Sequence, residues 1–255
     1  MSRLRKLALA AGAALIVTAA GCGATLRLLS EPLPTPAQAA DGEADALAHA
    51  IEASVDTAAW SRTGAVSWGF GGRTEHLWDR QRHLDRVRWG DNEVLLDITK
   101  KTGRATVGGE PVHGAEADKL FEAAFAHWAN DSFWLNPLAK LFDDGTTRSI
   151  VALEGGGEGL LLSYSSGGVT PGDSYLWILG EDGRPAAWKM WVSIIPIGGV
   201  ETSWEGWTQL QTGAWVSATH HGAMGFTLEL TDIRGAATLA ELTGGEDPFA
   251  PLLSP

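Results

Sequence analysis

Cysteine is nearly absent from this chain, because Cys22 is the single one among 255 residues. No intramolecular disulfide can form, and a zinc ribbon or a two-cysteine redox motif is excluded as well. Basic residues are also few, with 19 Lys and Arg against 31 Asp and Glu and a formal net charge of −12. Phosphates repel such an acidic chain, so nucleic acid is not expected as a partner.

The first residues of the chain have the order of an export signal. Three basic residues, Arg3, Arg5 and Lys6, precede an uncharged run from Leu7 to Leu26. A short basic segment followed by an apolar core is typical of bacterial secretory signals. We therefore expect the chain to be exported and held at a membrane of the bacterial cell envelope through its N-terminus.

Cys22 is the expected site of membrane attachment. Residues Ala19–Cys22 resemble the lipobox of bacterial lipoproteins, in which small residues precede a cysteine that is acylated and becomes the mature N-terminus. The resemblance implies lipidation of Cys22, although Ala19 stands where the motif more usually has Leu. Two alternatives remain open: an uncleaved apolar run of about 20 residues could span the bilayer, and cleavage after Ala39 would follow a small-x-small sequence.

The chain divides into three regions. Residues 1–22 form the signal with its lipobox or a membrane anchor, residues 23–40 form a proline-rich tether, and residues 41–255 form a single domain. Prolines cannot continue a helix, so we expect an extended tether that lifts the domain off the membrane. A hydrophobic content of 44% is enough for a sizeable core.

Hydrophobic spacing predicts two helices and a series of strands in the domain. The first helix covers residues 42–58, after the candidate N-cap Asp41. The second covers residues 115–128 and is followed by a capped turn and a short helical piece at 130–137. Period-two alternation predicts strands at 66–70, 86–89, 94–98, 150–153, 160–164, 175–179, 187–195, 200–210, 215–220 and 226–230.

The order of these elements predicts an α+β fold. Short turns connect the strands, so neighbours pair antiparallel, and a sheet of this size tends to curl. We expect one large curled antiparallel sheet, a half-barrel, with the helices packed on one side. This architecture resembles the lipoprotein carriers of the LolA and LolB kind, and the resemblance implies an apolar cavity that receives acyl chains.

The residues themselves resemble an uncharacterised family of exported bacterial proteins. The likeness covers most of the domain and lies in His76–Arg80, Asn130–Trp134 and Gly168–Tyr175. It implies no known activity.

The sequence contains no catalytic motif. His76 shares a strand with Asp79, and a histidine near a carboxylate could act as a general base, which leaves a hydrolase as one alternative. No serine lies in a nucleophile elbow, however. His220 and His221 would face opposite sides of a strand, where they cannot jointly chelate one metal. We therefore expect no catalytic residue, no metal and no cofactor.

Tryptophan is frequent, with 12 Trp against 2 Tyr and 7 Phe. Each indole can bury a large surface and keep one N–H for a partner, so an aromatic cleft would suit an acyl chain or another apolar ligand. The candidate ligand-binding residues are Trp68, Trp78, Trp177, Trp188, Trp191 and Trp204. We expect a membrane-tethered, non-enzymatic protein that binds a lipid or hydrophobic small molecule. The alternative is a structural or interaction protein with a filled core and no cavity.

Overall fold

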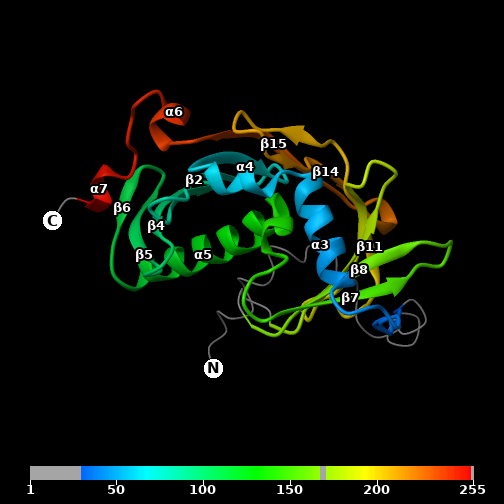
Figure 1. The fold of residues 1–255 in the computed structure, drawn as a ribbon. Helices are drawn as coiled ribbons and strands as arrows, with labels where there is room; N and C mark the ends of the chain where they lie inside the picture. The colour runs from blue at the N-terminus through cyan, green and yellow to red at the C-terminus, as the bar shows by residue number, and fades with distance from the viewer. Residues whose placement is uncertain (1–29, 167–170, 254–255) are drawn as a thin grey trace, which may run out of the picture.

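The chain folds into an α+β structure built on two antiparallel sheets (Figure 1). The computed structural model describes residues 30–166 and 171–253. The expected signal and Cys22 lie outside the described residues. Within these ranges, no helix is both long and apolar enough to cross a bilayer.

Most helices flank the strands, and one long helix divides the strands into two groups. The helices are α3 (Glu43–Ser54), α4 (Thr57–Arg62), α5 (Ala115–Leu135), α6 (Leu239–Thr243) and α7 (Ala250–Leu253), with 3-10 helices η1 (Pro137–Lys140) and η2 (Ala223–Gly225). The strands before α5 are β1 (Ala65–Phe70), β2 (Thr74–Asp79), β3 (Leu84–Trp89), β4 (Asn92–Asp97), β5 (Thr102–Val107) and β6 (Glu110–Val112). Those after it are β7 (Thr146–Ala152), β8 (Glu158–Tyr164), β9 (Ser174–Leu179), β10 (Pro185–Trp191), β11 (Val200–Ser203), β12 (Thr208–Gln209), β13 (Trp215–Val216), β14 (Thr219–His221) and β15 (Thr227–Ala236).

An eight-stranded sheet forms the larger half of the fold, in the order β14-β15-β1-β2-β3-β4-β5-β6. Strands β1 to β6 follow one another as hairpins, which confirms the antiparallel pairing expected from their short turns. The late strand β15 returns to pair with β1, where Ala65 lies opposite Ala236. Because side chains alternate between faces, Trp68, His76 and Val87 share one face of this sheet.

A five-stranded sheet, in the order β11-β10-β9-β8-β7, forms the other half, and β12 pairs with β13 separately. The two larger sheets meet at an isolated bridge between Thr202 and Gly222. The expectation of one large curled sheet is therefore corrected: the strands form two larger open sheets and one two-stranded sheet. The strand expected at 200–210 is interrupted because β11 ends at Ser203 and Gly206 adopts a positive φ of 63°.

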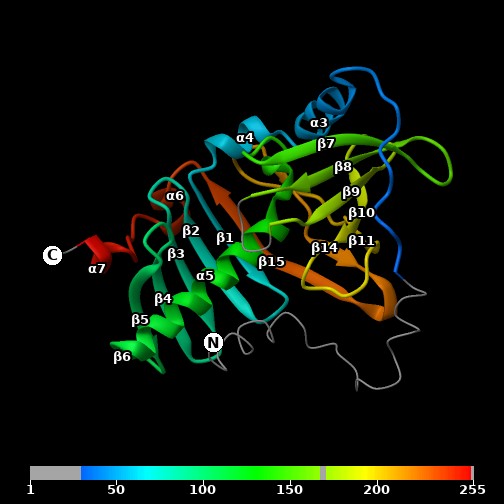
Figure 2. The ribbon, with the colours of Figure 1, turned by 90° about the horizontal axis from the view of Figure 1, so that it is seen from below.

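Helices cover both faces of the eight-stranded sheet (Figure 2). On one face, Phe121 of α5 packs against Val87. On the opposite face, Leu239 and Phe249, from α6 and the segment before α7, pack against Leu77. The expectation that the helices lie on one side is thus wrong, because the C-terminal helices are too short for helical periodicity to reveal them.

The first expected helix is in fact two helices, α3 and α4. Asp56 separates them, because its φ of 51° is left-handed and its carboxylate accepts a hydrogen bond from the N–H of Ala59 (2.8 Å). This N-cap starts a new helix in a new direction. Consequently Ile51 of α3 packs against the five-stranded sheet, whereas Trp60 of α4 packs beside Trp68 of the eight-stranded sheet.

The helix α5 is longer than expected. It runs from Ala115 to Leu135 and passes through Asp131, where a capped turn was expected. The cap lies further on, at Asn136, whose side chain accepts a hydrogen bond from the N–H of Ala139 at the start of η1. The carboxylate of Asp131 bonds to the sheet instead of to its own backbone, so it does not end the helix.

Residues 30–40, the described part of the expected tether, lie along the five-stranded sheet (Figure 2). We call this segment the strap. The N–H of Ala37 donates to the carbonyl of Ile150 in β7 (2.8 Å), and the N–H of Glu31 donates to the carbonyl of Gly198 (2.9 Å). The strap contains no helix until α3 begins, as expected, but it is docked on the domain and does not hang free.

Candidate functional site

Aromatic side chains gather between the C-terminal part of α5 and the five-stranded sheet. We define the aromatic cluster as Phe133 and Trp134 of α5, Tyr164 of β8, Tyr175 and Trp177 of β9, Trp188 of β10, Trp204 after β11, and His220 of β14. Strand alternation places these rings, because Trp177 lies opposite Trp188 in the ladder and both side chains point to the same face. Three of the six candidate tryptophans, Trp177, Trp188 and Trp204, meet here.

These three tryptophans form the centre of the aromatic cluster. The ring centroids are 5.0 Å apart between Trp177 and Trp188, 4.9 Å between Trp188 and Trp204, and 5.1 Å between Trp177 and Trp204. Tilted and edge-to-face pairs at such distances stabilise a fold by about 0.5–1.5 kcal/mol beyond the burial of their surface. The three side chains are buried.

A series of ring contacts leads from this centre to the surface. The ring of Trp134, on α5, lies 4.9 Å from Trp188 and 5.2 Å from His220. On another side it lies 6.4 Å from Phe226, which is 38% exposed. Trp134 therefore separates the buried centre of the cluster from the solvent.

Several buried polar groups of the aromatic cluster have no hydrogen-bond partner among the described residues. They are the indole N–H groups of Trp177, Trp188 and Trp204, the hydroxyl of Tyr164 and Nε2 of His220. Leaving a buried donor or acceptor unpaired costs about 1–3 kcal/mol, and folded proteins pair nearly all of them. The cluster contains five of the eleven such atoms among the described residues, and the indole N–H groups of Trp68, Trp78 and Trp128 are further examples outside it.

His220 is neutral in this environment. Its Nδ1–H donates to the carbonyl of Ser203 (3.0 Å), so Nε2 keeps a lone pair and can only accept a hydrogen bond. Burial lowers the pKa of His220 from 6.5 to about 4, because a protonated ring would carry a poorly solvated charge between Trp134 and Trp204. The aromatic cluster thus offers one acceptor beside three indole donors.

Acidification is expected to destabilise the protein through His220. Its folded pKa of about 4 lies below the unfolded value of 6.5, so the unfolded chain binds a proton that the folded chain excludes. The stabilisation is complete above pH 6.5 and is lost as the pH falls to 4, by about 3 kcal/mol. Urea unfolding at both pH values should show that the parent chain loses about this much more stability than His220→Phe. Equal losses in the two chains would contradict the expectation, and His49→Phe, at an exposed position, is the control.

Comparison with known proteins adds no family at this point. No family model matches the chain, and no curated protein matches it either. The likeness to lipoprotein carriers and to the uncharacterised exported family therefore stays a prediction.

A second buried cluster joins α5 to the eight-stranded sheet. His76 of β2 bonds through Nδ1 to Asp85 Oδ2 of β3 (2.7 Å) and through Nε2 to Asp131 Oδ2 of α5 (3.0 Å). The three side chains are at most 3% exposed. We call this arrangement the His76 network. Since both ring nitrogens face carboxylate oxygens, the imidazolium form is the one that can donate to both.

The charge state of His76 follows from two opposed effects. Burial lowers the pKa of His76, but the charges and hydrogen bonds of Asp85 and Asp131 outweigh it and raise the pKa from 6.5 to about 9. At neutral pH the network therefore contains one imidazolium between two acidic side chains. No part of the His76 ring is exposed, and both of its nitrogens are bonded to carboxylates.

The His76 network positions part of the aromatic cluster. Asp131 lies in the last turns of α5, two and three residues before Phe133 and Trp134. The bond from Asp131 to His76 holds this end of α5 on the sheet. We infer that His76, Asp85 and Asp131 are positioning residues for the two rings that lie between α5 and the five-stranded sheet.

The other candidate tryptophans lie elsewhere. Trp68 stacks on His76 (4.3 Å between centroids), and Trp78 makes an edge contact with Trp128 of α5 (5.6 Å), both on the eight-stranded sheet. Trp191 lies on the outer face of the five-stranded sheet, and its indole N–H donates to the carbonyl of Glu31 in the strap (2.9 Å). The six residues therefore do not form a single site, and Cys22 lies outside the described residues.

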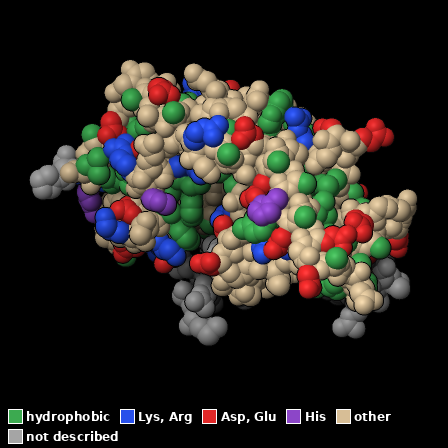
Figure 3. Space-filling model, in the orientation of Figure 1, with side chains coloured by type: hydrophobic (Ala, Val, Ile, Leu, Met, Phe, Trp, Pro, Cys, Tyr) green, Lys and Arg blue, Asp and Glu red, His purple; other side chains and the backbone are tan. Residues whose placement is uncertain are grey.

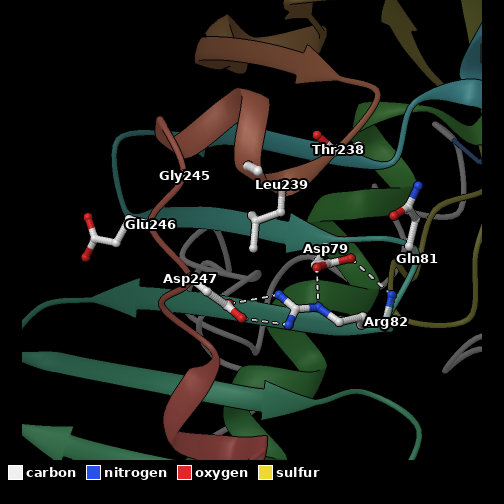
Figure 4. Close-up of a pocket in the computed structure, with 9 residues that line it drawn as sticks. Asp79, Gln81, Arg82, Thr238, Leu239, Gly245, Glu246 and Asp247 are labelled. Carbon is white, nitrogen blue, oxygen red and sulfur yellow. Dashed lines mark hydrogen bonds and ion pairs between the residues drawn. The ribbon is translucent and has the colours of Figure 1, made fainter.

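Asp79 points away from His76. The two residues are three apart on β2, so their side chains lie on opposite faces. Asp79 accepts a hydrogen bond from Nε of Arg82 (2.6 Å), and Arg82 binds Asp247 with both terminal nitrogens (2.8 Å each), as Figure 4 shows. The expected pairing of His76 with Asp79 is thus wrong. These paired charges line a surface hollow of about 280 Å³ that does not include the aromatic cluster.

The described residues contain no group of three or more side chains arranged to hold a metal ion. His220 and His221 are adjacent in β14, and only the first is buried. The hydrogen bond of His221 Nδ1 goes to the hydroxyl of Thr227 (3.1 Å).

Sequence reasoning missed Asp85 and Asp131, although both left a signal. Asp85 alternates with Val87 and Trp89 on a strand, so it lies on an otherwise apolar face. Asp131 follows Ala124 by seven residues, which places it on the apolar stripe of α5. A carboxylate on an apolar face needs a buried partner.

Proposed function

We propose that this chain is a membrane-tethered protein of the bacterial cell envelope that binds a lipid-like or hydrophobic ligand in the aromatic cluster and catalyses no reaction on it. The export signal and Cys22 support the tethering. The unpartnered polar groups of the aromatic cluster carry the proposal for binding.

The chemistry of these groups restricts the ligand. The surrounding rings are apolar, so the bulk of the ligand must be apolar too. The indole N–H groups of Trp177, Trp188 and Trp204 can only donate and therefore need acceptor oxygens, whereas Nε2 of His220 needs a donor. An acyl chain joined through an ester carbonyl to a group with a free hydroxyl provides all three features. We expect a ligand of this class.

Entry of the ligand requires movement at the end of α5. In this proposal Trp134 moves away from Trp188 and opens the cluster on the side of Phe226. The two sheets then act as one bent wall, joined at the bridge between Thr202 and Gly222, with α5 against it. In this proposal the bent wall and α5 would correspond to the half-barrel and the covering helices of the lipoprotein carriers.

A structural protein with a filled core is the second candidate. The close packing of Trp177, Trp188 and Trp204 favours it, because their rings already contact one another. In that case edge-on contacts between an N–H and a neighbouring ring would replace hydrogen bonds in part.

Native mass spectrometry of the full chain, extracted from the membranes of producing cells, separates the two candidates. The parent chain should carry a bound small molecule with an acyl chain. The double variant Trp188→Phe, Trp204→Phe keeps an aromatic ring at each position but removes two donors, and its affinity for the ligand should fall about tenfold for each 1.4 kcal/mol lost. Trp128→Phe is the control, because it removes an equally unpartnered N–H beside the eight-stranded sheet, where the ring of Trp128 contacts Trp78 and Phe125.

Each outcome of this measurement decides something. A parent chain without any bound molecule would refute ligand binding and favour the filled core. A molecule retained equally in all three chains would place binding outside the aromatic cluster. The mass of the N-terminal peptide would also show whether Cys22 is acylated or Met1 is intact.

A further inference from the structure

The strap begins beside the loop that joins β10 to β11. The N–H of Glu31 donates to the carbonyl of Gly198, the N–H of Gly198 donates to the hydroxyl of Ser30, and the indole of Trp191 donates to the carbonyl of Glu31, each at 2.9 Å. Lys189 adds an ion pair with the carboxylate of Glu31 (2.8 Å). These bonds hold the first described residues against the loop.

The strap approaches the two glycines of this loop closely. A Cβ atom on Gly198 would lie 2.5 Å from Cδ1 of Trp191 and 2.7 Å from the carbonyl oxygen of Glu31. Gly199 has a φ of +78°, and a Cβ atom there would lie 2.6 Å from that of Glu31. Larger residues at either position would collide with the strap, so its docking depends on both glycines.

Residues 192–197 of this loop form an uncharged apolar turn, which we call the apolar loop. The turn is closed by the N–H of Ile195, which donates to the carbonyl of Val192 (3.1 Å). Asp173 also holds the turn, because its carboxylate accepts a hydrogen bond from the N–H of Ser193 (2.9 Å). Ile194, between them, is 53% exposed. Ser193 and Pro196 of the same loop are exposed as well.

The length of chain before the strap limits how far the apolar loop can lie from the membrane attachment. Ser30 lies eight residues after Cys22, and this stretch spans at most about 29 Å even when fully extended. If the apolar run is instead an uncleaved anchor that ends at Leu26, four residues span about 14 Å. In both cases the apolar loop lies close enough to the attachment point to reach the bilayer surface.

We propose that the apolar loop contacts the lipid surface from which the N-terminus emerges, with Ile194 at the contact. The inference rests on the membrane tethering in the proposed function. The contact is apolar and not electrostatic, because the chain is acidic and acidic side chains gather over the half of the molecule that contains the five-stranded sheet (Figure 3). Anionic lipids would not attract such a surface.

Site-specific fluorescence on the full chain tests this contact. Ile194→Cys is labelled with a bimane group after extraction from cell membranes and reconstitution into phosphatidylcholine vesicles. Val107→Cys is the matched control, because Val107 is a hydrophobic residue at 37% exposure on β5, next to the edge strand of the other sheet. The parent chain, with Cys22 alone, gives the background. We expect brominated lipid to quench the Ile194 label several-fold more than the Val107 label, and aqueous iodide to show the reverse.

Other quenching results would refute the contact between Ile194 and the lipid surface. An Ile194 label that iodide quenches as strongly as it quenches the Val107 label would refute the contact. Protection from both quenchers would place a second copy of the chain on the loop and refute it too. Flotation of the vesicles reports the tether independently: a chain that does not float refutes the tether and the contact together, whereas a floating chain without lipid quenching refutes only the contact.

In Gly198→Val the strap should detach, and lipid quenching should fall while flotation persists. Undiminished quenching in this variant would show that the strap does not place the loop.

Discussion

Replacing His76 with leucine is expected to lower the free energy of unfolding by about 3–5 kcal/mol, because removing one member of a buried charged group leaves the others uncompensated. The carboxylates of Asp85 and Asp131 would lose their shared donor in a place that water does not reach. One carboxylate oxygen of Asp85 has no partner in the folded chain, so loss of His76 would remove the bond that the other oxygen makes. Urea unfolding at pH 6.5 measures the change.

Two controls separate the charge from the packing. His49→Leu changes an exposed histidine and should alter stability by no more than about 0.5 kcal/mol. A triple variant with leucine at positions 76, 85 and 131 removes the whole network and should recover most of the loss, as replacement of buried charged groups by apolar ones often does. A loss below about 1 kcal/mol in His76→Leu would contradict the expectation.

Raising the pH from 6.5 to 9 is expected to remove about 3 kcal/mol of stability through the same histidine. The folded pKa of His76 is about 9 and the unfolded value is 6.5, so the folded chain keeps a proton that the unfolded chain releases. The stabilisation is complete below pH 6.5 and is lost as the pH rises through 9. Together with the acid loss at His220, this predicts a stability maximum near pH 6.5.

Nitrogen-15 spectra of the imidazole rings test the alkaline limb directly. The His76 resonances should move with a midpoint near pH 9, while the His220 ring should stay neutral between pH 6.5 and 10. The pH dependence of unfolding above 6.5 should be flatter in the triple leucine variant than in the parent chain. A His76 midpoint at or below 6.5 would mean that the carboxylates do not stabilise the imidazolium.

Local pattern predicted the strands better than their assembly into sheets. Period-two alternation identified most of the pairing strands, because a face that packs on a core has to be apolar at every second residue. The predicted ranges do not cover β2, β5 and β6. The division into two sheets depends on Gly206 and on the return of β15 to β1, and neither is visible in a window of ten residues. The helix α5 shows the same limit. Asp131 reads locally as a turn residue, but its partner His76 lies 55 residues away.

The sequence predicted an aromatic-lined cleft, and the described residues form a packed aromatic cluster of partly different composition. Tryptophan content indicated an aromatic cluster, and Trp177, Trp188 and Trp204 do meet. Trp191 was included because its strand is apolar on both faces, yet parity alone separates it from Trp188, three residues earlier. Phe133 and Trp134 were left out because the expected turn at 130–137 hid their position on α5.

The pairing of β1 with β15 has a consequence for the order of folding. Ala65 and Ala236 are neighbours in the sheet but lie at opposite ends of the domain sequence, so the middle of the eight-stranded sheet closes only when nearly all of the chain is present. Contacts of such long sequence separation form late, since the entropy of closing the loop precedes any gain from the contact. The β1–β6 meander alone would present an open edge at β1 until then. In the proposed function, in which the chain crosses a membrane before it folds, this late closure would keep the polypeptide unfolded during transit, and pairing of the final strand would complete the fold.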